Sequence, residues 1–458
     1  MDSTTSTSFI NRLPNELLVH ILTFLDSPSP LQEALKGDPD NISRPLQFDS
    51  CLPLKTASLV CRLWRRSLLQ LLFRHVVWSF QRVYKPESID IASQIPLLEF
   101  LRRNGLSKDA ESFTLLIDPP KASGGSSHSD GQFWGLLPPE DCPPQSPMSS
   151  ALSTVNTNHS VARAELQDSP ASADETTARE TKTSAPGVWD NNWLWEALFA
   201  QIDPLRITFI SYPDVLASLL SRVVDLSSEW AFKSHKHVLS LSRTSRFALH
   251  PDPGASAGPV DSLQSTSQQA SRTAIPSTVF TIRDWTALLV NEGSFVPVYS
   301  AYEFFHYVPP TLLPVVLNTS DPSFHPIQKT LTSFSYIATF PLSRHIRDVV
   351  IRFCPAVEHL YMQMMPRADN FWQDTKLAHI DITDLWLECD MAYSIIMKEV
   401  FNSEANTGLR ALHTFECGDT TTEEAWTMAM QYIVMNGMRG WKLAQAGHFV
   451  RQNVHNAS

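Results

Sequence analysis

The chain has 458 residues, with 36 Lys and Arg against 47 Asp and Glu, which gives a formal net charge of −11. This acidic balance argues against broad non-specific binding to nucleic acid or to anionic lipid, so neither is expected as a partner. No apolar run approaches the ~20 residues that span a bilayer. The start, MDSTTSTSF, lacks the basic region and the apolar run of a secretory signal.

Two further bulk properties set the expected class of protein. Hydrophobic residues make up 43% of the chain, enough for a real core, and the length fits about three units at ~150 residues each. The six cysteines are scattered and contain no CxxC pair. They indicate reduced thiols and a cytoplasmic or nuclear protein.

The first predicted helix lies in NRLPNELLVHILTFLD, residues 11–26, and it is apolar nearly all round. A polar stretch, 26–53, separates it from a second helical run, LKTASLVCRLWRRSLLQLLFRHVVW, residues 54–78. Two or three short helices contain too few residues for a core of their own. Their apolar faces must therefore pack against another surface, either the rest of this chain or a different protein.

The remaining ordered blocks repeat the order helix, then strand. A helix near 95–104 precedes a strand at 112–117, and a helix at 189–202 precedes a strand at 206–210. Farther on, Pro355 ends a helix before a strand at 356–362, and LAHIDITDL and GLRALHTFECGD are each expected to supply a strand. A last helix is expected between a capping box of Thr421 and Glu424 and a stop at Asn436-Gly437.

This order predicts an α/β fold. The apolar residues Phe334, Leu360, Ile380 and Leu412 recur at intervals of 26, 20 and 32 positions, which favours an irregular leucine-rich-repeat-like solenoid. An ordinary α/β domain with a mixed sheet is the alternative. The expected divisions are 9–80 (helices, with an insertion at 26–53), 91–117 (first helix–strand unit), 118–187 (disordered insertion), 188–249 (helix–strand–helix unit), 250–277 (disordered insertion), 278–445 (repeat-like region) and 446–458 (polar tail).

The sequence gives little support for a catalytic or a metal-binding site. The chain has no Gly-rich phosphate loop, no Gly-x-Ser-x-Gly and no His-Glu-x-x-His. His235 and His237 are two apart with no third ligand in view, and we expect them at a solvated helix end or loop. A tryptophan group (Trp189, Trp193, Trp195, Trp230, Trp285) is expected in the core, with a recognition surface as the second interpretation. No cofactor, no metal and no enzymatic activity are predicted.

The two N-terminal runs resemble an F-box. The matching features are the Leu13-Pro14 start, Glu16-Leu17, Ile21, Leu25, and Leu59-Val60-Cys61 with Trp64 three residues later. F-boxes join these halves by a few residues, whereas residues 26–53 intervene here. The closure entropy of a loop grows slowly with length, so this insertion can loop out, but it can also hinder docking.

The resemblance implies a substrate-receptor subunit of an SCF-type cullin–RING ubiquitin ligase. Such a receptor binds a small acidic adaptor protein, and through it cullin, while its C-terminal region holds a protein substrate. The positions that would contact the adaptor are Leu13, Pro14, Leu17, Ile21, Leu25, Leu59, Val60, Cys61 and Trp64. Arg62, Arg65 and Arg66 suit an acidic partner. The alternative is a scaffold or helix–turn–helix-like module that acts outside ubiquitin ligases.

Overall fold

A computed structural model describes fifteen stretches of the chain, and the statements below concern these residues. They are 13–25, 31–42, 52–80, 96–117, 192–222, 235–245, 277–300, 312–317, 326–352, 354–367, 371–373, 377, 379–401, 408–438 and 440–452. The two predicted disordered insertions, 118–187 and 250–277, lie outside them except for Ser277.

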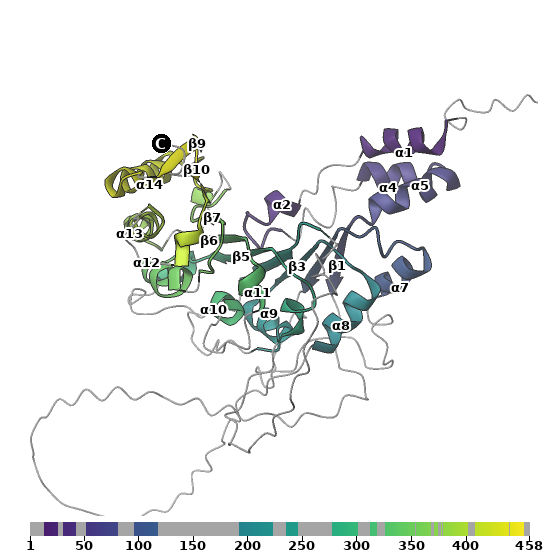
Figure 1. Ribbon diagram of the computed structural model, residues 1–458, viewed down its shortest axis with the longest axis horizontal. Coiled ribbons are helices and arrows are strands. Elements are labelled where there is room, and N and C mark those ends of the chain that lie inside the picture. The colour runs from purple at the N-terminus through teal and green to yellow at the C-terminus, as the bar shows by residue number, and fades with distance from the viewer. Residues whose placement is uncertain are drawn as a thin grey trace, which may run out of the picture.

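Ten strands form one open sheet (Figure 1). Their bounds are β1 His75–Phe80, β2 Ser112–Ile117, β3 Arg206–Ser211, β4 His237–Ser242, β5 Ala287–Ser294, β6 Ser333–Thr339, β7 His359–Gln363, β8 Thr414–Cys417, β9 Trp441–Gln445 and β10 His448–Arg451. The order in the sheet is β1-β2-β3-β4-β5-β6-β7-β8-β10-β9, so the strands follow the chain except for the final pair. β4 runs antiparallel to β3 and β5, β10 runs antiparallel to β8 and β9, and the other neighbours are parallel.

The helices connect these strands. Their bounds are α1 Asn15–Thr23, α2 Leu31–Ala34, α4 Leu52–Ser58, α5 Arg62–Leu72, α7 Pro96–Arg103, α8 Asn192–Gln201, α9 Pro213–Leu219, α10 Leu312–Leu317, α11 Pro326–Thr330, α12 Ser343–His345, α13 Ile382–Phe401 and α14 Glu423–Asn436. α12 continues as a π-helical turn, Ile346–Ile351. Short 3-10 turns lie at Thr278–Phe280, Val296–Ser300, Phe371–Gln373 and Gly408–Ala411.

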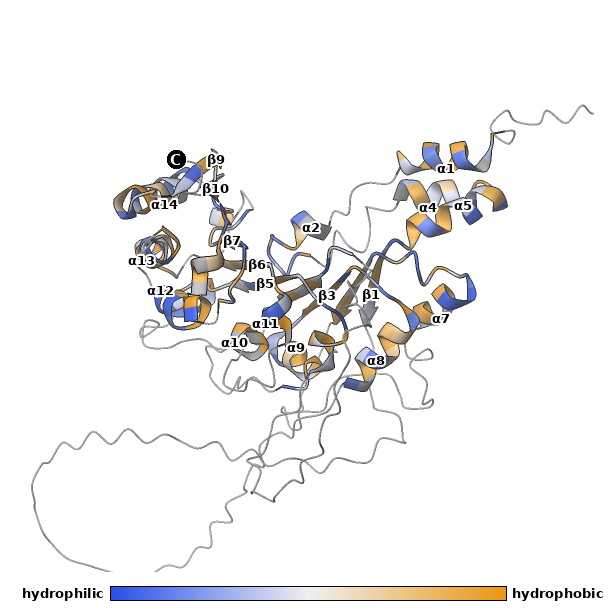
Figure 2. Ribbon diagram, in the orientation of Figure 1, coloured by the Kyte–Doolittle hydropathy of each residue, from blue (hydrophilic) through white to orange (hydrophobic). Residues whose placement is uncertain are grey.

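The main core lies between one face of the sheet and the layer of helices from α7 to α14. Because side chains alternate along a strand, every second residue faces this core, as Phe113 and Leu115 do in β2 and Phe334 and Tyr336 in β6. Figure 2 shows the apolar sides of these helices turned towards the sheet. α2 lies on the opposite face (Figure 1).

One hydrogen-bond pattern recurs at each parallel step between described strands. At each step, the N–H groups of two successive residues at the start of one strand donate to the same carbonyl oxygen. That oxygen belongs to the residue just before the neighbouring strand. Glu111 and Ser112 share the oxygen of Arg74, and Glu358 and His359 share that of Thr332. The parallel parts of the sheet are therefore built from one repeated step.

The structure is a mixed α/β fold, but a leucine-rich-repeat solenoid is not shown, because the sheet is open and two of its strands run against the rest. The repeat spacing predicted from the apolar residues gave the wrong cross-strand partners after β7. Phe334 does pair with Leu360 across β6 and β7, but Leu360 pairs with Phe415, not with Leu412. Ile380 lies in a bend outside the sheet.

Two local predictions within the chain need correction. The second helical run breaks after Ser58, restarts at Arg62 and gives way to β1, whose β-branched Val76 and Val77 pair with β2. The strand expected in LAHIDITDL is replaced by the start of α13, where the Asp381 carboxylate accepts a hydrogen bond from Thr383 N at 2.8 Å.

The end of the chain also differs from its prediction. Within the expected polar tail, 446–458, the segment His448–Arg451 forms β10, because Phe449 is fully buried opposite Phe415. α14 ends at Gly437, as predicted, with φ of 77°. Its N-cap is Thr422 without a side-chain hydrogen bond, so the capping box of Thr421 and Glu424 was wrong.

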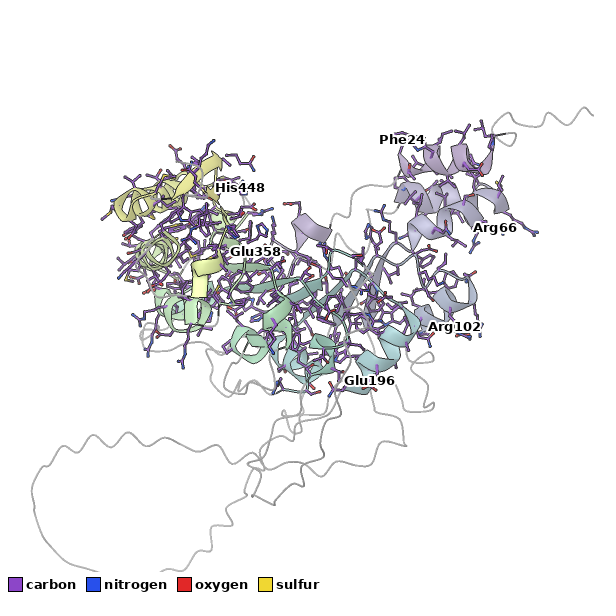
Figure 3. All side chains as sticks on the ribbon, viewed as in Figure 1. Phe24, Arg66, Arg102, Glu196, Glu358 and His448 are labelled. Atoms are coloured by element: carbon purple, nitrogen blue, oxygen red, sulfur yellow. The ribbon has the colours of Figure 1, made fainter. Side chains whose placement is uncertain are left out.

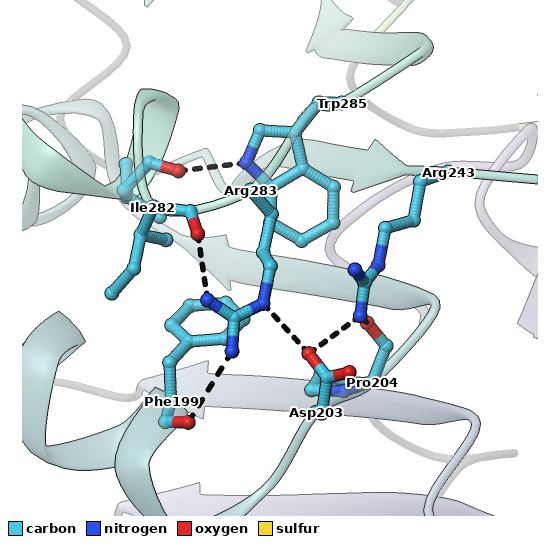
Figure 4. A network of polar contacts seen from close by, with 8 residues as sticks. Phe199, Asp203, Pro204, Arg243, Ile282, Arg283 and Trp285 are labelled. Carbon is cyan, nitrogen blue, oxygen red and sulfur yellow. Dashed lines mark hydrogen bonds and ion pairs between the residues drawn. The ribbon is translucent and has the colours of Figure 1, made fainter. Parts of the chain in front are cut away.

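An ion-pair network fixes the loop between α8 and β3. Oδ1 of Asp203 accepts from Arg243 at 2.5 Å and from Arg283 at 2.7 Å, as Figure 4 shows. Nearby, the indole N–H of Trp285 donates to Val279 O at 2.7 Å, and that of Trp195 donates to Leu219 O at 3.1 Å. Both tryptophans are fully buried and belong to the core, as predicted. Trp189 and Trp230 lie outside the described residues.

The fully buried His237 at the start of β4 predicts a loss of stability in acid. Burial lowers the pKa of this imidazole to about 4 and outweighs the attraction of the Glu292 carboxylate. An unfolded histidine titrates near 6.5, so the free energy of unfolding falls as the pH drops from about 6.5 towards 4. Between pH 7.5 and 5 we expect a loss of about 2 kcal/mol that a His237→Leu variant does not show. Urea titrations at the two pH values measure this, with His413→Leu, at an exposed position, as the control.

Candidate partner-binding surface

The amino-terminal helices α1, α4 and α5 form a small unit at one end of the molecule (Figure 1). They enclose a core of five buried apolar side chains: Leu18, Leu22, Leu54, Ala57 and Leu68. Trp64, Leu71 and Leu72 pack against it. This core is separate from the main one and small, so it covers only one side of each helix.

The outer side of α1 stays exposed and apolar. Leu17, Ile21 and Leu25, all predicted contact positions, expose 51%, 50% and 38% of their surface. Phe24 exposes 78% and was missed, although its place three residues after Ile21 puts it on the same face. Figure 3 shows Phe24 at the outer edge of this unit. Leu17, Ile21 and Phe24 therefore keep half or more of their surface exposed in the described part of the chain.

The turn between α4 and α5 adds a second exposed apolar segment. Leu59 and Val60 expose 79% and 63%, and Leu63, which was missed, exposes 38%. Exposed apolar side chains mark an interaction site when they join others in one contiguous patch. Because α5 packs against α1, this segment and the α1 face belong to the same small unit.

The other predicted positions have different surroundings. Cys61 is the N-cap of α5, and its sulfur accepts from Trp64 N at 3.5 Å. Trp64 is half-buried and packs on the small core, so part of its role is structural. Leu13 is half-buried and Pro14 is exposed. Arg62, Arg65 and Arg66 are all exposed, and Figure 3 shows Arg66 at the rim of the unit.

The unit is joined to the sheet without a linker. α5 ends at Leu72 and β1 begins at His75. The Phe73 ring contacts Phe100 of α7 at 5.0 Å between centroids, and Arg74 pairs with Glu111 at 2.9 Å. A partner held on α1 and α5 would therefore have a fixed position relative to the sheet.

The insertion between the two helical runs provides a second connection. Residues 31–42, named here the strap, lie on the sheet face opposite the helix layer. Leu35 and Ile42 are buried there against Leu116, Ile210 and Val238. The insertion was expected to loop out or to hinder docking, but this part of it packs on the sheet instead.

Polar contacts hold the strap in register. Nδ2 of Asn291 donates to the carbonyl oxygens of Leu35 and Gly37, both at 2.8 Å. The Asp40 carboxylate pairs with Nδ1 of His235 at 2.8 Å and accepts from Lys236 N at 2.9 Å. His235 was expected at a solvated position, so its half-buried hydrogen bond to Asp40 corrects that prediction.

The double contact of Asn291 gives a direct test of the strap. Asn291→Ala leaves two strap carbonyl groups without their donor, at a cost of about 1–3 kcal/mol. We expect amide hydrogen exchange, measured by mass spectrometry, to become about tenfold faster in peptides that cover 31–42 and to stay unchanged in α1. Asn436→Ala, which removes one bond to Tyr432 O at the end of α14, is the matched control. Equal protection of the strap in both variants would contradict its docking.

No group of three or more His, Cys, Asp or Glu side chains among the described residues is placed to hold a metal ion. None of the helices in the described part of the chain is long and apolar enough to cross a bilayer. Four cysteines lie within it, Cys61, Cys354, Cys389 and Cys417, and all are free thiols.

Comparison with known proteins gives one match. Residues 10–77 match the model of the F-box-like family. The matched segment contains α1, α4 and α5 and reaches into β1, so it coincides with the unit that exposes the apolar surface. No curated protein and no solved structure matches the chain.

Proposed function

We propose that this chain, which contains an F-box-like domain at residues 10–77, is a substrate-receptor subunit of an SCF-type cullin–RING ubiquitin ligase. In this role it is non-catalytic: it binds the acidic adaptor through the exposed faces of α1 and α5 and, through the adaptor, cullin. It acts in the cytoplasm or the nucleus and promotes ubiquitination and degradation of a protein substrate. The observation that carries the proposal is the coincidence of the family match with an apolar surface that the described chain leaves open.

The energetics support a specific contact. Each large apolar side chain that becomes fully buried contributes about 1.5–3 kcal/mol. The free energy gained when the exposed parts of four side chains become buried exceeds the lower estimates of the cost of association. These side chains are Leu17, Ile21, Phe24 and Leu59. The exposed arginines of α5 add attraction to an acidic partner and speed its association.

The sheet supplies the surface for the substrate in this proposal. Its repeated parallel step supports the leucine-rich-repeat-like interpretation, which we retain as part of the proposal. The strap and the direct α5–β1 connection hold this surface at a fixed distance from the adaptor. A rigid receptor suits ubiquitin transfer, because the substrate must be presented in a defined position.

The test is assembly with the adaptor. The full chain is mixed with a purified SCF adaptor, and the complex is sought by size-exclusion chromatography and quantified by calorimetry. A one-to-one complex with a dissociation constant below about 1 μM is expected. Absence of a complex with a folded chain would exclude the receptor role and leave a scaffold outside ubiquitin ligases.

A further inference from the structure

A pocket lies at the carboxyl ends of β7 and β8, far along the sheet from β1, the strand that follows the F-box-like helices. Its volume is about 590 Å³. Three segments line most of it: Met365–Arg367 after β7, the turn that contains Trp372, and the chain from Glu416 to Glu424. The carboxyl ends of parallel strands are where open α/β sheets bind ligands. The location therefore marks the pocket as a candidate site.

The floor of the pocket is fixed. The buried Asp419 carboxylate accepts from the backbone N–H of Met364 and Met365 at 2.9–3.1 Å and from the hydroxyl of Tyr393 at 2.7 Å. A Cβ atom at Gly418 would lie 2.2 Å from the Tyr361 hydroxyl, so the chain there can approach β7 only as glycine. These contacts lock the ends of β7 and β8 together before any ligand arrives.

One wall presents an aromatic ring. Trp372 stacks on Trp386 with centroids 5.8 Å apart and an interplanar angle of 19°, yet 41% of its surface is exposed and it lines the pocket. Tryptophan is the side chain that most often dominates a binding surface, and its ring face attracts cations.

Other residues that line the pocket are acidic. Glu416, Glu423 and Glu424 line the pocket, and all three are exposed. Glu423 and Glu424 lie in the first turn of α14, where the helix dipole stabilises their negative charge. The pocket thus combines an aromatic wall with three carboxylates.

The strap offsets the one positive charge among the lining residues. Arg367 forms an ion pair with Glu33 of α2 and donates to the Tyr361 hydroxyl at 3.0 Å and to Gln363 Oε1 at 3.1 Å. With its guanidinium engaged by these partners, Arg367 does not balance the three carboxylates. The electrostatic potential inside the pocket is therefore negative.

We infer that this pocket binds an arginine or lysine side chain of a protein partner, which stacks on Trp372 and pairs with the carboxylates of Glu416, Glu423 and Glu424. The inference rests on the proposed function and deepens it, because it gives the chemical class of the substrate segment that the receptor holds. The strap takes part in selectivity, since Glu33 keeps Arg367 from repelling a cation.

The test uses the full chain and a fluorescein-labelled peptide of glycine, serine and leucine that carries two arginines. Matched peptides carry glutamate or phosphoserine in their place, and binding is measured by fluorescence anisotropy. The arginine peptide should bind at least tenfold more tightly than either. Trp372→Leu and the double variant Glu423→Gln/Glu424→Gln should each weaken it at least tenfold, while circular dichroism shows each chain folded at the assay temperature.

The control is Glu196→Gln/Glu358→Gln, which changes the net charge equally at two exposed positions that do not line the pocket and are labelled in Figure 3. Equal weakening by this control, or tighter binding of the glutamate or phosphoserine peptide, would overturn the inference. Adaptor binding is measured on the same proteins. A chain that binds the adaptor but not the arginine peptide refutes only the pocket, whereas the reverse result refutes only the receptor role.

Discussion

Replacing Leu17 and Ile21 with aspartate should abolish adaptor binding and leave the chain folded. Both side chains point away from the small core of the amino-terminal unit and are half exposed, so their loss costs little stability. In a complex, each aspartate would place a charge in an apolar contact, at a cost of about 2 kcal/mol or more. The dissociation constant should therefore rise at least about 100-fold. Calorimetry with the purified adaptor measures this change.

A matched control exists on α13. Leu387 and Met391 are also four residues apart on a helix and expose 56% and 37% of their surface. The double change Leu387→Asp/Met391→Asp should leave adaptor binding unaltered. Leu18→Asp provides the opposite comparison, because Leu18 is buried and its replacement should unfold the unit. Unchanged affinity in the Leu17/Ile21 variant would show that another surface binds the adaptor.

The second large effect is expected at Glu292, a fully buried carboxylate at the end of β5. It accepts from the Tyr336 hydroxyl and contacts Nε2 of His345, both at 2.8 Å, and it accepts from Leu313 N at 3.1 Å. Burial and the Glu292 charge raise the pKa of Tyr336 well above its ordinary value, so the phenol stays protonated and donates. One side chain thus connects β5, β6, α10 and α12.

Glu292→Ala should lower the free energy of unfolding by about 3–5 kcal/mol, because it leaves three buried polar groups without their partner. Glu292→Gln retains an acceptor and should cost less. Glu358→Ala, at an exposed position, should change the value by no more than about 0.5 kcal/mol. Urea denaturation followed by tryptophan fluorescence compares the three. A loss below about 1 kcal/mol in Glu292→Ala would contradict the role of this network.

Several elements of the fold follow from local sequence. The strands at 112–117 and 206–211 lie where their apolar runs predict them, and Gly437 ends α14 with the positive φ that glycine adopts readily. The F-box-like pattern could also be recognised from the sequence, because its residues are close in the chain and recur with the period of a helix. Such signals need no knowledge of distant segments.

The sequence predicted the exposed apolar surface of α1 only in part. α1 is apolar nearly all round, so its periodicity offers two adjacent stripes and cannot tell which one is covered. The packing of α4 and α5 decides this: it buries Leu18 and Leu22 and leaves Leu17 and Ile21 open. In the same way, packing assigns Trp64 partly to the small core.

The sequence by itself determined an α/β chain with an F-box-like segment at residues 10–77, because those signals lie within a few turns of helix or one strand. Only the tertiary structure decided the docking of the strap, the direction of β4 and the acidic pocket. Each depends on residues far apart in the chain, such as Asp40 with His235 or Glu33 with Arg367, separated by 195 and 334 positions. No local pattern encodes such pairs, because their free energy is gained only when the whole sheet has formed.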